Sequence, residues 1–302
     1  MDHDALFKQL LRVFFVEFIK AFLPQVDAYL DPSSIEFLDK EIFTRIAGGD
    51  RHEPDLVVKA KFKGQNTFFL IHIDNQASAQ SWFPRRMFEY FAILHIEQGL
   101  AVYPIALFTY ASPKRPEPDR YQVVFPDMTP LDFCYRVIQL NRLNWRDFIR
   151  NPNPAAAALM TRMNIAPKDR PRVKLECVRL IATLKLTPAK SSLIRRFVDS
   201  YLHLSKSEVR QYNREVNTLK EPEREAVMEV MNEWEAIGEK RGRRLERLEA
   251  LMDYLRGRFS RVPKTVRTKL EPLSPAQLKQ ITQALPGFSD LSDVDRWINE
   301  HR

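Results

Sequence analysis

Hydrophobic residues follow two different periods in the first 140 residues of the chain. Over 4–23 and 81–98 they recur at every third or fourth position, which predicts two amphipathic helices, the first ended by Pro24 and the second by Gly99. Runs rich in β-branched and aromatic residues lie between these helices and after the second one. They predict extended segments or strands over 33–43, 55–62, 67–76, 102–110, 121–125 and 133–140. This mixture of helices and strands predicts an α/β domain.

From about residue 141 the pattern becomes helical. A hard break at Asn151-Pro152-Asn153-Pro154 precedes an Ala-rich helical start, and glycine is absent until Gly238. The expected helices cover 172–204 (broken near Pro188), 206–219, 223–259, a segment ending at Leu270, 274–287 and 291–298. Ser274 is expected to cap its helix, and Trp297 is expected in the core of the last module. We therefore expect three parts: an α/β core over 1–140, a helical extension over 141–237 and a small helical domain over 238–302.

Composition supplies ample material for a core, with 44% hydrophobic and 11% aromatic residues. The formal charge of +8 and the pI of about 9.4 are compatible with a polyanionic partner. In the helix over 223–259 acids are interleaved with the arginines, which favours a solvated helix over a nucleic-acid stripe. Cys134 and Cys177 fit no metal or redox spacing and are both expected to be buried thiols. With no signal-peptide pattern and no apolar run of about 20 residues, no membrane association is expected, and the expected location is the cytoplasm.

The hairpin formed by 55–62 and 67–76 carries the most suggestive polar residues. If its turn is symmetric about Gly64-Gln65, Asp55 and Asp74 lie directly opposite each other, with Cβ atoms about 5 Å apart. His72 and Gln76 would share the face of Asp74, because side chains alternate along a strand. Two carboxylates this close are tolerable if they are exposed or if a cation lies between them. His72 is either a packed core residue or a ligand or base.

Other candidates lie on both sides of this hairpin. Glu41, two residues after Asp39, is either a solvated charge or an acid near a metal site. Arg86 and Tyr90 are four residues apart on a predicted helix and should project together. Either Arg86 packs over the Tyr90 ring, or it faces the carboxylates or a phosphate. The chain has no Walker loop, no G-x-G-x-x-G, no G-x-S-x-G and no His/Cys cluster with zinc spacing.

The order of elements and four short motifs resemble a known nuclease superfamily. Helix, strand, acid-bearing hairpin, helix and strand follow in the order of the PD-(D/E)XK core, and Pro54-Asp55 and Asp74-Asn75-Gln76 stand where its motif residues stand. Within this superfamily, the chain resembles the recombination-promoting nucleases, the Rpn group, also called PD-(D/E)XK nuclease family transposases. The motifs shared with that group are Asp4-Ala5-Leu6-Phe7-Lys8, His72-Ile73-Asp74-Asn75-Gln76 and Arg86-Met87-Phe88-Glu89-Tyr90. The last 60 or so residues resemble a helical domain of unknown function that is appended to bacterial members.

The resemblance implies a restriction-endonuclease-like mixed sheet flanked by helices, followed by an all-α C-terminal region. It implies Mg²⁺- or Mn²⁺-dependent hydrolysis of DNA, with the metal bound by Asp55, Asp74 and the backbone carbonyl of Asn75, and with no small-molecule cofactor. Gln76 replaces the superfamily lysine, so it can orient a water molecule but cannot neutralise charge. Asp74 also departs from the closer relatives, which have Glu there.

Cleavage of both strands would need two sites, so a homodimer is expected. The competing hypothesis is a catalytically degenerate protein that keeps the nuclease fold and acts as a DNA-binding or protein-interaction module.

Overall fold

The computed structural model describes residues 3–38, 56–74, 82–150, 152–259 and 262–301. The chain divides into two compact units, unit 1 over Met1–Val230 and unit 2 over Met231–Arg302. Helix α10, Glu223–Arg258, runs through the boundary between them. In the described part of the chain no helix is both long enough and apolar enough to cross a membrane.

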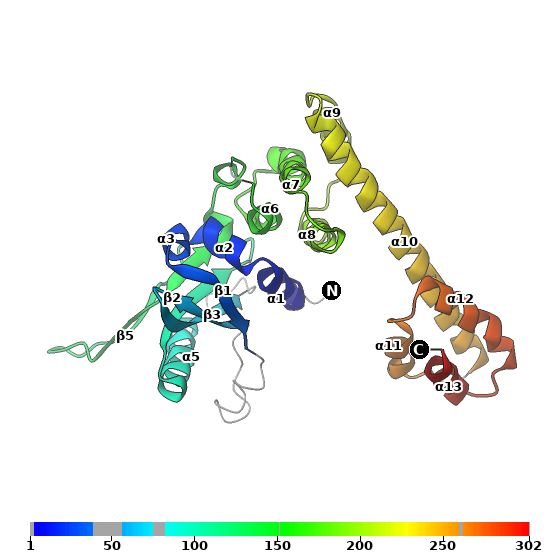
Figure 1. The fold of residues 1–302 in the computed structure, drawn as a ribbon, viewed down its shortest axis with the longest axis horizontal. Helices are drawn as coiled ribbons and strands as arrows, with labels where there is room; N and C mark the ends of the chain where they lie inside the picture. Colours follow the sequence, from blue (N-terminus) through cyan, green and yellow to red (C-terminus); the bar gives the residue numbers. More distant parts are fainter. Residues whose placement is uncertain (1–2, 39–55, 75–81, 151, 260–261, 302) are drawn as a thin grey trace. The chain divides into compact units, whose positions relative to one another are not determined.

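Unit 1 is built on a mixed sheet of five strands in the order β1-β2-β3-β4-β7 (Figure 1). The strands are β1 Leu30–Phe37, β2 Leu56–Phe62, β3 Gln65–Asp74, β4 Ala101–Phe108 and β7 Arg136–Gln139. The pairs β1–β2 and β2–β3 are antiparallel, whereas β3–β4 and β4–β7 are parallel. A separate antiparallel ribbon joins β5, Arg120–Val123, to β6, Leu131–Cys134. The expected α/β class is therefore confirmed, as a mixed sheet flanked by helices with a helical C-terminal region.

The predicted hairpin is present, but its predicted register is wrong by two residues. Leu56 pairs with Ile71 and Phe62 pairs with Gln65, so the turn consists of Lys63 and Gly64 rather than Gly64 and Gln65. Both turn residues have positive φ, 50° and 77°, which is the backbone that matches the right-handed twist of the two strands. Gly64 adopts this conformation without steric cost, and Gln65 is left to begin β3. A shift of two residues leaves each side chain on the face where it was expected.

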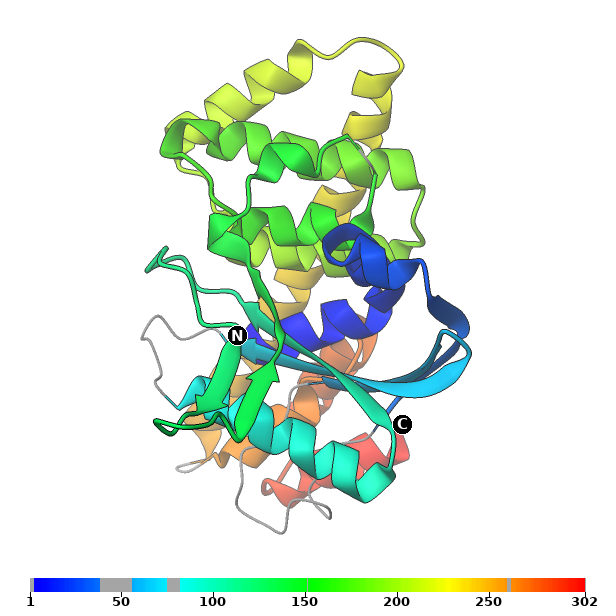
Figure 2. The ribbon, with the colours of Figure 1, turned by 90° about the vertical axis from the view of Figure 1, so that its left-hand side faces the viewer.

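Helices cover both faces of the sheet (Figure 2). On one face lies α5, Phe83–Gln98, where Tyr90 and Leu94 pack with Val57, Phe68 and Leu70. Gly99 ends this helix with a φ of 63° and donates its N–H to the carbonyl of His95, as the sequence predicts. On the other face lie α1, His3–Val13, and α2, Phe15–Phe22.

The predicted helix over 4–23 is interrupted rather than continuous. Its two halves are separated at Phe14, whose φ of −126° and ψ of 38° lie outside the helical region. The Phe15 ring then meets the Phe69 ring of β3 at 5.9 Å. The helix ends just before Pro24, as the sequence predicts, since α2 stops at Phe22. Pro24 then opens the short helix α3, Pro24–Asp27, in keeping with the preference of proline for a first helical turn.

The helical extension packs on the side of the sheet that α1 and α2 cover. Its helices are α6 Pro154–Leu159, α7 Arg170–Leu184, α8 Pro188–Tyr201 and α9 Lys206–Asn217. Short 3₁₀ turns precede α6, at Leu140–Arg142 and Trp145–Asp147, and two more lie between α6 and α7, at Met160–Arg162 and Pro167–Asp169. Every residue of α6 is buried, and α6 contacts α2, α7 and α8. Four consecutive alanines, 155–158, allow these neighbours to approach closely. Asn153 caps α6 and donates its side-chain amide to the carbonyl of Glu17 in α2, at 2.9 Å.

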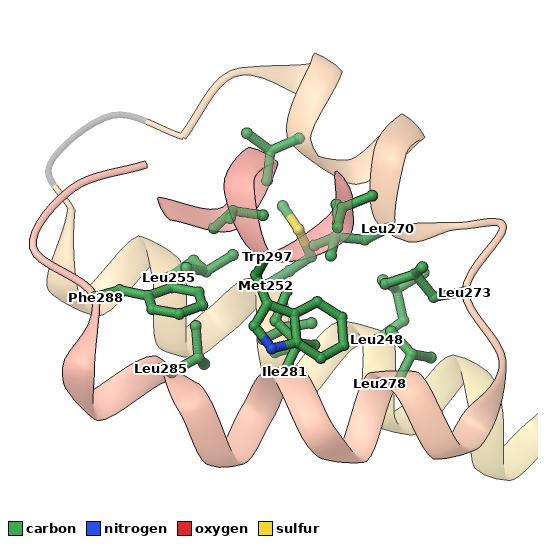
Figure 3. Close-up of a cluster of buried hydrophobic side chains, with 14 residues drawn as sticks. Leu248, Met252, Leu255, Leu270, Leu273, Leu278, Ile281, Leu285, Phe288 and Trp297 are labelled. Atoms are coloured by element: carbon green, nitrogen blue, oxygen red, sulfur yellow. The ribbon is translucent and has the colours of Figure 1, made fainter. Parts of the chain in front are cut away.

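Unit 2 packs the end of α10 against three short helices around one apolar core (Figure 3). They are α11 Lys264–Leu270, α12 Pro275–Ala284 and α13 Ser292–Glu300, with a 3₁₀ turn at Leu285–Gly287. Ser274 caps α12 in a reciprocal capping box with Gln277, and Trp297 is buried in the core, so both expectations for this part are confirmed.

The expectation of a buried thiol is confirmed for Cys177 and wrong for Cys134. Cys177 lies in α7 and is buried, and burial raises the pKa of its thiol. Cys134 is exposed. It follows Phe133 on β6 and, because side chains alternate, occupies the open face of a two-stranded ribbon whose other face buries Phe133.

A pair of leucines on α10 provides a test of the core of unit 2. Leu251 is fully buried, and Leu251→Ala should cost about 2–5 kcal/mol through lost burial and a residual cavity. Leu245 on the same helix is 46% exposed, so Leu245→Ala should change stability by less than about 0.5 kcal/mol. Calorimetric unfolding of the full chain measures both. Equal shifts in the two variants would contradict this core.

Candidate active site at the carboxyl edge of the sheet

The ends of three parallel strands meet in one row at one edge of the main sheet. Asp74, the last residue of β3, pairs with Phe108, the last residue of β4, and Phe108 pairs with Gln139, the last residue of β7. The antiparallel strand β2 begins near the same edge, since its first residue, Leu56, pairs with Ile71. In open α/β sheets the carboxyl ends of parallel strands are where ligands usually bind. We call this row and the segments that follow it the carboxyl edge.

The structure describes only part of the predicted metal site. The backbones of His72 and Asp74 lie in β3, and Asp74 ends the strand at the carboxyl edge. Their side chains lie outside the described residues, as do Asp55, Asn75, Gln76 and Glu41 altogether. The expectation that Asp55 and Asp74 lie directly opposite each other depended on a turn at Gly64-Gln65, and that turn is not formed. Among the side chains that are described, no group of three or more His, Cys, Asp or Glu could hold a metal ion.

Arg86 lies in the first turns of α5, close to this edge. The helix begins beside the end of β4, because the Phe83 and Phe108 rings are 4.9 Å apart. Arg86 donates from Nε to the hydroxyl of Tyr90 at 2.6 Å, so these two side chains project together as their spacing predicts. Its guanidinium also lies 5.0 Å from the Trp82 ring centroid and 5.3 Å from that of Tyr90. Two aromatic rings and a hydroxyl therefore hold this cation in place.

Arg85, next to Arg86, has a different environment. It projects into solvent and pairs with Glu89 at 3.0 Å, one turn further along the helix. No carboxylate in the described part of the chain forms such a pair with Arg86, so the positive charge of Arg86 is not neutralised by a described neighbour. The two adjacent arginines thus offer a matched comparison: one in an exposed ion pair and one held by aromatic side chains at the carboxyl edge.

Gln139 fixes the proline-rich segment that follows β4. Its side-chain amide donates to the carbonyl of Arg115 at 2.8 Å and accepts from the backbone N–H of Glu117 at 3.2 Å. Asn141, two residues later, donates to the carbonyl of Pro113 at 2.8 Å, and the Tyr110 hydroxyl donates to the Glu117 carboxylate. Gln139 and Asn141 are both buried. The two hydrogen bonds of Gln139 and the one of Asn141 fix the backbone of this segment, so 113–117 is held against the carboxyl edge.

A half-buried arginine from the helical extension reaches the same place. Arg162 donates from Nε to the carbonyl of Thr109 at 2.7 Å, directly after the end of β4. Its guanidinium lies 4.8 Å from the Tyr201 ring centroid. Burial lowers the pKa of Arg162, although a guanidinium stays charged in proteins. The extension therefore supplies both a hydrogen bond and a positive charge to the end of β4.

Sequence reasoning missed Gln139, Arg162 and Trp82 as residues of this edge. A polar residue at the end of an apolar strand was a signal for Gln139. Trp82 was visible as an aromatic residue directly before the predicted helix. Arg162 carried no signal, because it is 53 residues from Thr109 in the sequence and nothing local indicates their contact.

Comparison of the chain with protein-family models, with curated proteins and with solved structures finds no match. A functional proposal therefore depends on the sequence resemblance and on the arrangement of the carboxyl edge.

If Gln139 holds the segment 113–117, loss of its side-chain amide should make this segment open more often. Gln139→Leu removes two hydrogen bonds of about 0.5–1.5 kcal/mol each, so tryptic cleavage after Lys114 should become roughly ten- to a hundredfold faster. The control is Gln122→Leu, at an exposed position on β5. Its cleavage rate should match that of the unsubstituted chain. Similar rates in the two variants would show that Gln139 does not hold the segment.

Proposed function

We propose that this protein is an endonuclease that hydrolyses phosphodiester bonds in DNA with Mg²⁺ or Mn²⁺. The observation that carries the proposal is the position of Asp74 at the carboxyl end of β3, in one row with the ends of β4 and β7. The order helix, strand, hairpin, helix, strand along the described chain agrees with the order that the nuclease resemblance implies. A recombination-promoting role would follow the same resemblance.

Oxygen donors at this edge suit a hard divalent cation. In the proposal Asp55, which directly precedes β2 in the sequence, and Asp74 hold the metal together with the backbone carbonyl of Asn75. A bound Mg²⁺ polarises a phosphoryl oxygen and lowers the pKa of a bound water molecule. Phe68 and Leu70 face α5, and Asp74 is an even number of residues further along β3, at a position of the same face of the strand. This position favours a site that opens on the α5 side of the sheet, where Arg86 lies.

Arg86 compensates for the residue that the motif lacks. Gln76 can orient the attacking water through its amide but cannot neutralise the charge that develops on the phosphate. Arg86 is a permanent cation, held by Tyr90 and Trp82 at the end of the sheet, and a guanidinium can bind two phosphate oxygens at once. His72 and Glu41 are retained as accessory candidates, His72 as a ligand or base and Glu41 as a further acid.

The replacement of lysine by Gln76 also favours a second candidate function. A chain that keeps the sheet and its basic side chains but cannot stabilise the transition state would still bind DNA or a protein partner. The two functions differ in one observable, because only the nuclease cuts.

Removing the proposed metal ligands should abolish cutting. Loss of a group that merely orients a metal ligand typically lowers metal affinity or activity by about 10- to 100-fold. Loss of a ligand itself should cost at least as much, so Asp74→Asn and Asp55→Asn should each slow Mg²⁺-dependent plasmid cleavage by at least about 100-fold. Glu97→Gln, at an exposed acid near the C-terminal end of α5, serves as the control and should cut normally. Equal cleavage by all three variants would place the activity elsewhere. No cleavage by the unsubstituted protein, with DNA binding intact, would favour the non-catalytic module.

The two neighbouring arginines separate a role in phosphate binding from a general loss of charge. Arg86→Ala should lower kcat/KM for cleavage about tenfold, which corresponds to one charge-assisted hydrogen bond of about 1.5 kcal/mol. Arg85→Ala removes the same charge from an exposed ion pair and should change kcat/KM less than about twofold. Steady-state cleavage assays and thermal unfolding of both variants provide the measurement. Equal effects of the two substitutions on kcat/KM would show that Arg86 has no specific role in phosphate binding at the site.

A further inference from the structure

We infer that the outer face of α9 is a docking surface for the phosphate backbone of nucleic acid. This inference deepens the proposed function, since a DNA-cutting enzyme must hold its polyanionic substrate, but it is carried by different residues in a different part of unit 1. We call the three side chains Lys206, Arg210 and Arg214 the α9 stripe.

The positive charge of the chain is concentrated in the helical extension. Residues 1–140 contain 15 Lys and Arg against 18 Asp and Glu, so the part that carries the candidate active site has an acidic excess of three. Residues 141–230 contain 18 basic and 10 acidic residues, a basic excess of eight that equals the net charge of the whole chain. A polyanion should therefore be attracted to the extension rather than to the sheet.

Within the extension, α9 presents its cations on one face. Members of the α9 stripe are four residues apart, so they follow one side of the helix at intervals of about 6 Å. All three are exposed. Tyr212 and Val216 lie on the opposite side, where α9 packs against α7. The direction of the stripe is therefore fixed by the packing of the helix.

The acids of α9 do not neutralise this stripe. Glu208 is occupied in the capping box with Ser205 and in an ion pair with Arg170 at 2.9 Å. Glu215 accepts a hydrogen bond from Gln211 at 2.9 Å. No carboxylate within the described ranges pairs with a member of the stripe. Elsewhere many surface cations are paired; in unit 2, Arg256 pairs with Asp253 and Lys269 pairs with Asp295.

The chemistry of this face fits nucleic acid better than a membrane. Asn213 and Asn217 are exposed on the same side of the helix and can donate to phosphate oxygens. A nucleic-acid strand places a charge about every 3.4 Å along the duplex axis, so each stripe cation can reach a phosphate of its own. Membrane binding by a helix requires a free apolar face, and that of α9 is packed against the protein.

Salt-dependent binding tests this inference. The probe is a fluorescein-labelled duplex of random sequence, and anisotropy is measured with the full chain in EDTA so that no cutting occurs. The triple variant Lys206→Gln, Arg210→Gln, Arg214→Gln should bind at least tenfold more weakly. The plot of log K against log salt should become shallower by about 2 to 3, because three phosphate contacts are lost.

A matched control removes the same charge from unit 2. Lys264→Gln, Lys279→Gln and Arg256→Gln lie at exposed positions, and this triple variant should retain the affinity and salt slope of the unsubstituted chain. Equal losses in the two triples would show a general charge effect and overturn the inference, as would no loss in either. Vesicles with phosphatidylserine form a separate arm. If the α9 triple loses only vesicle binding, the surface recognises lipid and the inference is wrong.

The binding test of the α9 stripe and the cleavage test of the endonuclease proposal can fail separately. If the duplex is bound through the α9 stripe but no variant cuts, the endonuclease proposal fails and the docking surface stands. If Asp74→Asn abolishes cutting while the α9 triple binds normally, the docking surface fails and the endonuclease stands.

Discussion

The parallel pairing of β3 with β4 is the constraint on which the rest of unit 1 depends. Strand β2 is antiparallel to both of its neighbours, and a two-residue turn is enough to join it to β3, but β4 runs beside β3 in the same direction. The chain must therefore cross from one end of the sheet to the other, and α5 makes this crossing. The same pairing aligns the carboxyl ends of β3, β4 and β7 and places the start of α5 beside them. The parallel pairing of β3 with β4 therefore positions both the apolar side chains of α5 against the sheet and the row of strand ends at the carboxyl edge.

The segment that follows β4 at this edge is stabilised by side chains from other elements. The carbonyl of Thr109 and the backbone of 113–117 lie beyond the last ladder hydrogen bonds of β4, where buried polar groups need other partners. Arg162 from the extension, Gln139 at the end of β7 and Asn141 in the 3₁₀ turn Leu140–Arg142 provide them. The helical extension is consequently part of the support of the candidate site, although it begins after the sheet is complete. This agrees with its inclusion in the same compact unit.

Local signals in the sequence predicted most elements, and non-local contacts account for what was missed. The long helix α10, the cap at Ser274 and the αL glycine at 99 each depend on a few neighbouring residues. The hairpin was found for the same reason, but its register was not, because Lys63-Gly64 and Gly64-Gln65 are both plausible turns and the choice depends on strand twist. Cys134 was misplaced because an apolar run does not reveal that its ribbon has only two strands. At the candidate site, the pairing of Arg86 with Tyr90 followed from helical spacing, whereas the contact of Arg162 with Thr109 depends on the packing of the whole extension.

The separation of charge along the chain relates the two proposed surfaces to each other. Carboxylates that bind a divalent cation repel a polyanion unless the metal is bound, and the acidic excess of the first 140 residues adds to this repulsion. At physiological salt such repulsion reaches only about 8 Å, so it acts at the edge itself and not across the unit. A basic surface elsewhere can then supply affinity without neutralising the acids that the chemistry needs. Under the two proposals, the carboxyl edge would carry the chemistry, and the extension with its α9 stripe would supply most of the affinity for the polyanion.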